Sequence, residues 1–129
     1  MSVCDVAQSG KSLDGKLIRV TGVLRDAYSR VRNSYFDELV DDKCKDIEIH
    51  VGSADAAFLA NVPRSYKPDV KSIQRAEAVA ERAAAHGRKL SATVEGVLFV
   101  QEKDVSSAPR HKGYPFVLII QAIRNVKEY

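Results

Sequence analysis

The stretches that decide the fold are RVTGVL at residues 19–24 and TVEGVL at residues 93–98. Each predicts a β-strand, because side chains alternate in character, and each carries a glycine in the strand interior, Gly22 or Gly96. Glycine weakens a strand, but it permits a sharp bend or a close backbone approach. We therefore predict that both strands coil strongly, as a small sheet must when it closes into a barrel.

Periodicity elsewhere supplies the remaining elements. Alternation over 17–25 marks the first strand, and an apolar stripe at helical spacing between Asp69 and Gly87 marks an amphipathic helix. The stripe comprises Val70, Ile73, Ala76, Val79, Ala80 and Ala83. The full set of predicted elements is a short helix capped by Ser2, strands at 17–25, 34–40, 47–51, 90–101 and 116–126, a helical turn or two in 53–62, and a helix at 70–86.

The order of these elements predicts a mainly β chain with one domain, residues 1–129. Three strands, a helix and two strands are typical of the OB-fold, a five-stranded Greek-key barrel. The helix between the third and fourth strands would close one end of the barrel. The alternative is an unrelated α+β sheet in which two strands carry glycine.

Composition sets broad limits on function. The chain has 129 residues, 45% hydrophobic and 29% charged, which is ordinary for a globular domain. The longest apolar run, FVLII at 116–120, is far shorter than the ~20 residues of a membrane-spanning helix. A net charge of +3 permits a polyanionic partner without requiring one.

The chain has two cysteines, Cys4 and Cys44. No CxxC motif or Cys/His set is present, so we expect no structural zinc and no cofactor. Two interpretations remain open at this point: two reduced thiols in a cytoplasmic protein, or one disulfide in an oxidising compartment. The opening MSVCDV has no charged and apolar regions of the kind that form a signal peptide.

Several segments together resemble a family of small bacterial OB-fold-like proteins. They are SVCDVAQSGKSLDGKLIRVTGVLR, DDKC, LSATVEGVLFV and YPFVLIIQAIRNV. The resemblance implies a periplasmic or secreted protein with a leader before the SVC segment, and it favours a Cys4–Cys44 disulfide. It implies no catalytic residues. The segment RDAYSRVRNSYF at 25–36 departs from the family pattern, being longer and more basic.

An OB-fold binds ligands across its second and third strands and the loops on either side. Both loops are basic and aromatic here, a pattern suited to single-stranded nucleic acid, in which cations follow phosphates and rings stack on bases. Against this, residues 37–48 carry six carboxylates and two lysines. The alternative is that these segments are solvated hairpin ends, with Tyr35 or Phe36 in the core. The candidate ligand-binding residues are Arg25, Tyr28, Arg30, Arg32, Tyr35, Arg110 and Lys112.

Metal binding and catalysis have little support. The acidic turn lacks the DxDxDG spacing of a calcium loop. His50, predicted at the surface, His86, predicted at a helix end, and His111, in a loop, belong to no recognisable catalytic motif. We therefore predict a non-catalytic binding or interaction module outside the cytoplasm, with a protein or glycan partner. The alternatives are a nucleic-acid-binding protein and a small hydrolase-like enzyme. The strand at 116–126 is either buried on both faces or pairs across a homodimer.

Overall fold

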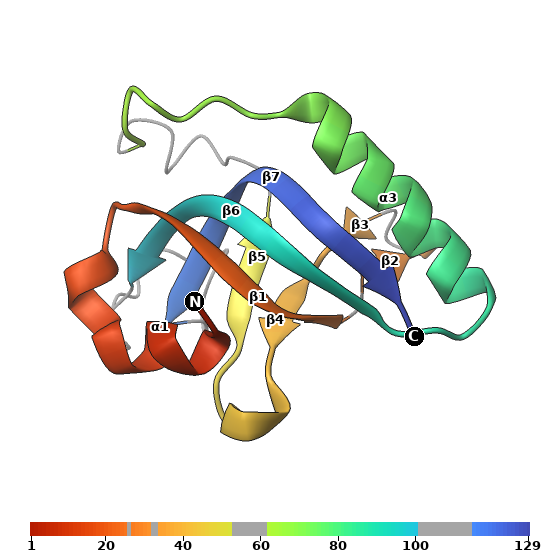
Figure 1. Cartoon of the computed structure of the whole chain (residues 1–129), viewed down its shortest axis with the longest axis horizontal. Coiled ribbons are helices and arrows are strands. Elements are labelled where there is room, and N and C mark those ends of the chain that lie inside the picture. Colours follow the sequence, from red (N-terminus) through yellow and green to blue (C-terminus); the bar gives the residue numbers. More distant parts are fainter. Residues whose placement is uncertain (26, 32–33, 53–61, 101–114) are drawn as a thin grey trace.

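A computed structural model describes residues 1–25, 27–31, 34–52, 62–100 and 115–129 of the chain (Figure 1). The elements are α1 (Val3–Ser9), η1 (Gly10–Leu13), β1 (Leu17–Arg25), β2 (Tyr28–Ser29), β3 (Ser34–Tyr35), β4 (Glu38–Val40), η2 (Asp42–Cys44), β5 (Ile49–Gly52), α3 (Val70–Ala85), β6 (Leu90–Val100) and β7 (Phe116–Glu128).

Five of the strands form a closed barrel in the order β1-β4-β5-β7-β6, with β6 pairing again with β1. All neighbours are antiparallel except β5 and β7, which run parallel. The mainly β class and the five-stranded barrel predicted from the sequence are therefore confirmed. So is the place of the amphipathic helix, because α3 lies between the third and fourth strands of the barrel.

The two glycines are needed because other atoms lie very close to them. A Cβ at Gly22 would lie 2.8 Å from the carbonyl oxygen of Val40 and 3.2 Å from a methyl of Val3. A Cβ at Gly96 would overlap the carbonyl group of Ile119. The register between β6 and β7 also shifts between Glu95 and Gly96, as it does at a β-bulge. Close backbone approach thus accounts for both positions, and the irregularity at Gly96 fits the predicted bending.

The N-terminal helix α1 packs against the barrel. It begins in a capping box, in which the backbone N–H of Asp5 donates to Ser2 Oγ (3.1 Å) and that of Ser2 donates to the Asp5 carboxylate (2.8 Å). Its buried residues, Val3 and Val6, join the barrel core. A disulfide joins Cys4 of α1 to Cys44 of η2, so the pairing implied by the family resemblance is present.

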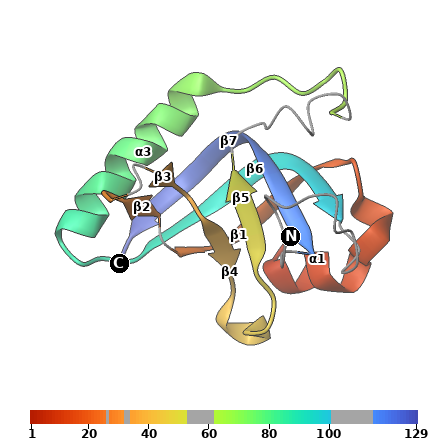
Figure 2. The same cartoon turned by 180° about the vertical axis from the view of Figure 1, so that it is seen from behind.

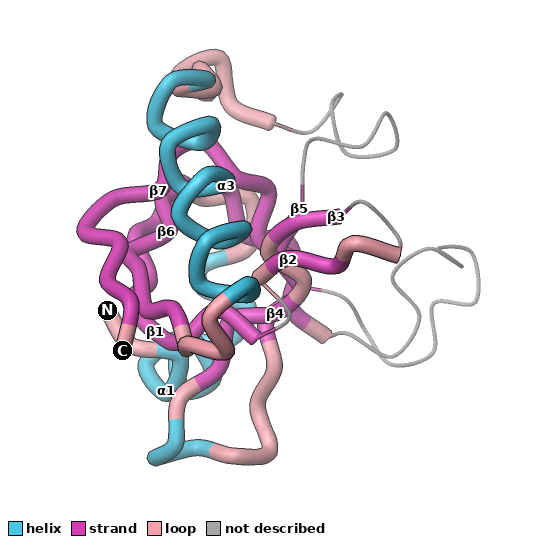
Figure 3. Tube along the Cα trace, turned by 90° about the vertical axis from the view of Figure 1, so that its right-hand side faces the viewer, coloured by secondary structure: helices cyan, strands magenta, loops and turns pink. Residues whose placement is uncertain are grey.

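Helix α3 lies on the opposite side of the barrel from α1 (Figures 1 and 2). Asp69 caps its start by accepting a hydrogen bond from the Ser72 N–H (3.1 Å). Its buried alanines, Ala76, Ala80 and Ala83, belong to the same apolar cluster as the barrel interior. Val70, assigned to this stripe from the sequence, is instead 57% exposed, because it lies in the first turn. Figure 3 shows α3 crossing in front of the barrel strands.

The second strand was only partly anticipated. Residues 34–40 form two short strands, β3 and β4, interrupted at Phe36, whose φ of 58° is left-handed. Strand β3 pairs with β2 in a separate two-stranded hairpin, with Tyr28 opposite Tyr35. The bend lets Phe36 turn its ring into the core while its N–H donates to the Ala27 carbonyl (2.9 Å). The predicted turns at 53–61 lie outside the described residues.

Strand β7 is buried on both faces, one of the two arrangements expected from its sequence. Leu118, Ile120 and Ile123 face the barrel interior, whereas Val117 and Ile119 belong to a second apolar cluster with Val97 and Phe99. Val62 and Tyr66 pack against that second cluster. Strand β7 pairs with β6 along most of its length and with β5 at Phe116–Ile119.

Candidate ligand-binding site

A cavity of about 490 Å³ opens where the end of β1, the start of β6 and the second half of α3 meet. This volume lies within the range of small-molecule sites. Its lining combines apolar and charged groups. The lining residues are Val23, Leu24, Arg25, Ala27, Tyr28, Val40, Asp42, Ala80, Ala83, Ala84, Arg88, Lys89, Leu90 and Tyr129.

The apolar part of the lining comes from the barrel core. Leu24, Leu90, Ala80 and Ala83 are buried and belong to the main hydrophobic cluster. The residues that α3 contributes to the lining include three alanines, whose side chains are small, and larger residues at these positions would reduce the cavity volume. The floor of the cavity can therefore accept an apolar group from a ligand.

Arg25 lines the cavity, but its charge is already balanced. Its guanidinium donates from Nη2 to both Glu38 and Glu48, from β4 and from the segment before β5. These two carboxylates raise the pKa of Arg25, through the hydrogen bonds first and their charges second. The acidic residues that argued against a phosphate groove in the sequence thus contact one of the predicted phosphate-binding arginines directly.

The two predicted aromatic residues also contact each other. The ring centroids of Tyr28 and Tyr35 are 5.0 Å apart, with the planes tilted by 32°. The Tyr35 hydroxyl donates to the carboxylate of Glu81 on α3. This bond is the main reason that the pKa of Tyr35 rises to about 12. Only Tyr28 of the pair lines the cavity.

The remaining predicted ligand residues are dispersed or undescribed. Arg30 is exposed in the turn of the β2–β3 hairpin. Arg32, Arg110 and Lys112 lie outside the described residues. The structure therefore places Arg25 and Tyr28 in the lining of one cavity, with Tyr35 stacked on Tyr28 and hydrogen-bonded to Glu81 of α3. The β2–β3 hairpin that carries both tyrosines lies next to α3 (Figure 2).

Three charged residues of the lining were not chosen from the sequence. Arg88 and Lys89 follow the glycine that ends α3, and Asp42 lies in η2. Arg88 forms an ion pair with Glu128 (3.4 Å). Within the described ranges, Lys89 and Asp42 have no ion pair. The sequence does show two adjacent cations, Arg88 and Lys89, directly after the end of a predicted helix. It does not show that this helix end lies next to β1, which is the contact that forms the cavity.

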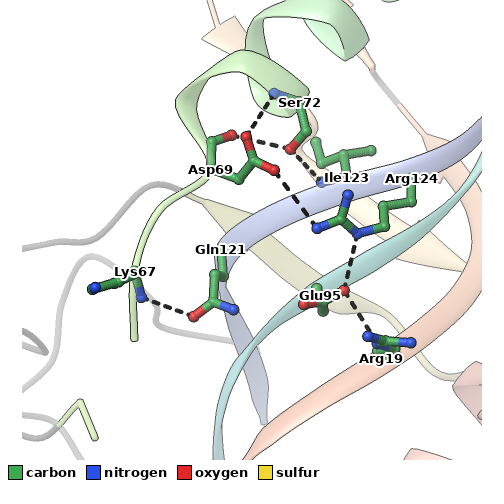
Figure 4. Close-up of polar contacts among 8 residues, drawn as sticks. All are labelled: Arg19, Lys67, Asp69, Ser72, Glu95, Gln121, Ile123 and Arg124. Atoms are coloured by element: carbon green, nitrogen blue, oxygen red, sulfur yellow. Dashed lines mark hydrogen bonds and ion pairs between the residues drawn. The ribbon is translucent and has the colours of Figure 1, made fainter. Parts of the chain in front are cut away.

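A separate polar network fixes the start of α3 on the outside of β7 (Figure 4). The buried carboxylate of Glu95 forms an ion pair with Arg19 (3.1 Å) and accepts a hydrogen bond from Arg124 (3.2 Å), and Arg124 also lies 3.6 Å from Asp69. The Ser72 hydroxyl donates to the Asp69 carbonyl (3.0 Å) and accepts from the Ile123 N–H (3.3 Å). These contacts join the start of α3 to β7 and β6.

Two of the three histidines, His50 and His86, lie in the described part of the chain, on β5 and at the end of α3. His50, predicted at the surface, is half-buried on β5, with Nδ1 3.9 Å from Oδ1 of Asp37. Neither residue lines the 490 Å³ cavity. His86 ends α3 as predicted, and its Nδ1 lies 2.9 Å from the Arg82 carbonyl oxygen. His111 lies outside the described residues.

Comparison with protein-family models, with curated proteins and with solved structures gave no match. A search of the described helices for a membrane-spanning segment found none. In the same part of the chain, no three His, Cys, Asp or Glu side chains are grouped closely enough to hold a metal ion.

Proposed function

We propose that this protein is a non-catalytic binding module that functions outside the cytoplasm and takes a small ligand in the cavity beside α3. The single observation that carries the proposal is the cavity itself. It has an apolar floor formed by Leu24 and Leu90 and charged residues around it, the usual composition of a small-molecule site. Two residues chosen from the sequence, Arg25 and Tyr28, lie in its lining.

The OB-type assignment of the barrel is part of the proposal. An OB-fold is a five-stranded Greek-key barrel. The parallel pairing of β5 with β7 and the helix between the third and fourth barrel strands support it. The resemblance to the family of small exported OB-fold-like proteins agrees with this assignment.

The Cys4–Cys44 disulfide supports the proposed extracytoplasmic location. Disulfides persist in oxidising compartments and are rare in the reducing cytoplasm. The location is tested by trapping thiols with an alkylating reagent in cells that produce the protein, followed by mass spectrometry. A fully alkylated protein would overturn it.

Nucleic-acid binding is the second candidate, carried by the exposed Arg30 at the hairpin turn. It receives less support than the cavity because Arg25 is neutralised by two carboxylates and Tyr28 stacks on Tyr35. Short oligonucleotides would have to bind with an affinity that falls steeply with salt, and Arg30→Ala would have to weaken that binding.

A matched pair of alanine variants on α3 tests the cavity. Ala84 and Ala85 are adjacent and exposed, but only Ala84 lines the cavity. We expect small-molecule fragments that bind the protein in amide NMR spectra to shift residues around the cavity. Binding should be weakened at least about tenfold by Ala84→Leu and left unchanged by Ala85→Leu. Fragments that map elsewhere, or that bind Ala84→Leu normally, would overturn the proposal.

A further inference from the structure

We infer that the ligand class of the cavity is a small organic acid with an apolar body, bound with its carboxylate toward Lys89. This inference rests on the proposed function, because it concerns the same cavity. The cationic side chains in the lining differ in whether they already form an ion pair with a carboxylate of the protein.

Two of the three cations have carboxylate partners. Arg25 contacts Glu38 and Glu48, and Arg88 contacts Glu128. Lys89 contributes an ammonium group without an ion pair in the described part of the chain. Its backbone is fixed, since its N–H donates to the Tyr129 carbonyl (2.8 Å) and its carbonyl accepts from the Tyr129 N–H (2.9 Å). The main chain of Lys89 is therefore fixed beside the cavity, and the ammonium group of its side chain can pair with a ligand.

The arrangement around Lys89 adds further positive charge. Glu128 accepts from Arg82 (2.8 Å) and lies 3.4 Å from Arg88, so one carboxylate is shared by two guanidinium groups. Arg88 and Lys89 in the lining, with Arg82 beside them, therefore share a single side-chain carboxylate, that of Glu128. The opposite balance holds around Arg25, which faces Glu38 and Glu48 with Asp42 nearby in the lining. An anionic group is thus favoured at the Lys89 end, and Asp42 repels it.

The apolar floor of the cavity favours a ligand whose remaining part is apolar. A carboxylate held near Lys89 directs the attached chain or ring over Leu90, Ala83 and Leu24, which exclude water. Burial of a single methylene contributes about as much to binding as a whole partly exposed ion pair does. The apolar body therefore supplies most of the affinity, and the charge selects the class.

Three probes with the same eight-carbon chain test the inference: octanoate, octanamide and octylammonium, each titrated calorimetrically. We expect octanoate to bind most tightly, octanamide less tightly, and octylammonium least. Lys89→Gln should weaken octanoate binding about fivefold and leave octanamide unchanged, since one exposed charge contact is removed. Asp42→Asn should strengthen octanoate binding. Lys71→Gln, which removes a lysine from α3 away from the cavity, is the matched control and should change nothing.

The results distinguish the acidic ligand class from the use of the cavity as a binding site. Octanamide or octylammonium binding as tightly as octanoate, or Asp42→Asn weakening octanoate, would overturn the acid class while the cavity remained a binding site. Absence of binding by all three probes would also overturn it. Octanoate binding that Ala84→Leu does not affect would place the ligand elsewhere and overturn both proposals.

Discussion

The hydroxyl of Tyr35 donates a hydrogen bond to the carboxylate of Glu81, 46 residues later in the chain. This bond attaches the β2–β3 hairpin to α3. The same hairpin borders the candidate cavity through Tyr28, which stacks on Tyr35. The phenol–carboxylate contact and the ring stack thus hold the hairpin against α3, in addition to the bond from the Phe36 N–H to the Ala27 carbonyl and the packing of Tyr28 on the core.

Alkaline titration should detect this contact. Ionisation of Tyr35 breaks the bond, so its pKa is raised from 10.0 to about 12. Because the folded-state pKa is raised, the stabilising contribution is complete below pH 10 and is lost as the pH rises through 12. Burial also raises the pKa of Tyr66, so the test uses a Tyr66→Phe background. In that background, absorbance at 295 nm should show a late-titrating component that is lost in Tyr35→Phe, kept in Tyr28→Phe, and shifted toward 10 in Glu81→Gln. An unchanged titration in Glu81→Gln would contradict the assignment.

Gly96 should tolerate no side chain. A Cβ there overlaps the Ile119 carbonyl, so Gly96→Ala must move β6 away from β7. We expect the free energy of unfolding in urea to fall by about 1–3 kcal/mol, the usual effect of overpacking. Gly52→Ala is the control, because its Cβ would meet the His50 ring at 3.7 Å, an ordinary contact. Equal stability of the two variants would argue against a close approach at Gly96.

The two arginines that contact Glu95 should differ in importance. Arg19 is 71% exposed and contacts Glu95, whereas Arg124 is 48% exposed and contacts both Glu95 and Asp69 at the start of α3. We expect Arg19→Met to change the free energy of unfolding by less than about 0.5 kcal/mol and Arg124→Met to lower it by about 1 kcal/mol. Urea unfolding measures both, and a larger effect at Arg19 would contradict this order.

Acid should weaken the contact between α3 and the end of β7. The hydrogen bond from Arg82 lowers the pKa of Glu128 below its ordinary value of 4.5, and the charges of Arg82 and Arg88 add to this. A lowered folded-state pKa means that the contribution is complete above pH 4.5 and is lost as the pH falls below it. Melting temperatures measured from pH 6 to 3 should therefore fall less steeply in Glu128→Gln, and an identical slope would contradict this assignment.

The disulfide should contribute strongly to stability. It joins residues 40 positions apart, and in the chain-entropy model closing such a loop is worth about 4 kcal/mol. We expect the Cys4→Ala, Cys44→Ala double variant to unfold at lower urea concentration by a corresponding amount. Reduced wild-type protein should behave in the same way. Unfolding that is independent of reductant would show that the bond contributes little.

Much of the fold was predictable because it depends on local patterns. Alternation identified the long strands, and the stripe between Asp69 and Gly87 identified α3. The predicted helix at 70–86 matches Val70–Ala85, and the predicted strands at 90–101 and 116–126 match Leu90–Val100 and Phe116–Glu128 within two residues at each end. The order of strands and helix along the chain is then compatible with only a few topologies for a closed five-stranded barrel.

The β2–β3 hairpin was missed because its signals are not local. Its strands have two residues each and depend on packing against α3 and on the left-handed Phe36, which no periodicity reveals. The cavity was missed in part for the same reason. Its lining comes from segments as far apart as Asp42 and Lys89. Arg25 and Tyr28 were found through their residue types, but the partners that neutralise Arg25 depend on strand register.

Closure of the barrel has a consequence for assembly. A partner that docks by extending a β-sheet needs a stretch of strand with one unpaired side. In the described part of the chain, β5 pairs with β7 only at Phe116–Ile119, so the remainder of β7 has β6 as its one neighbouring strand. The free side of that stretch is contacted by the start of α3, because the Gln121 carbonyl accepts from the Asp69 N–H (2.7 Å) and the Ile123 N–H donates to the Ser72 hydroxyl (3.3 Å). A partner that added a strand along this part of β7 would therefore have to displace the beginning of α3.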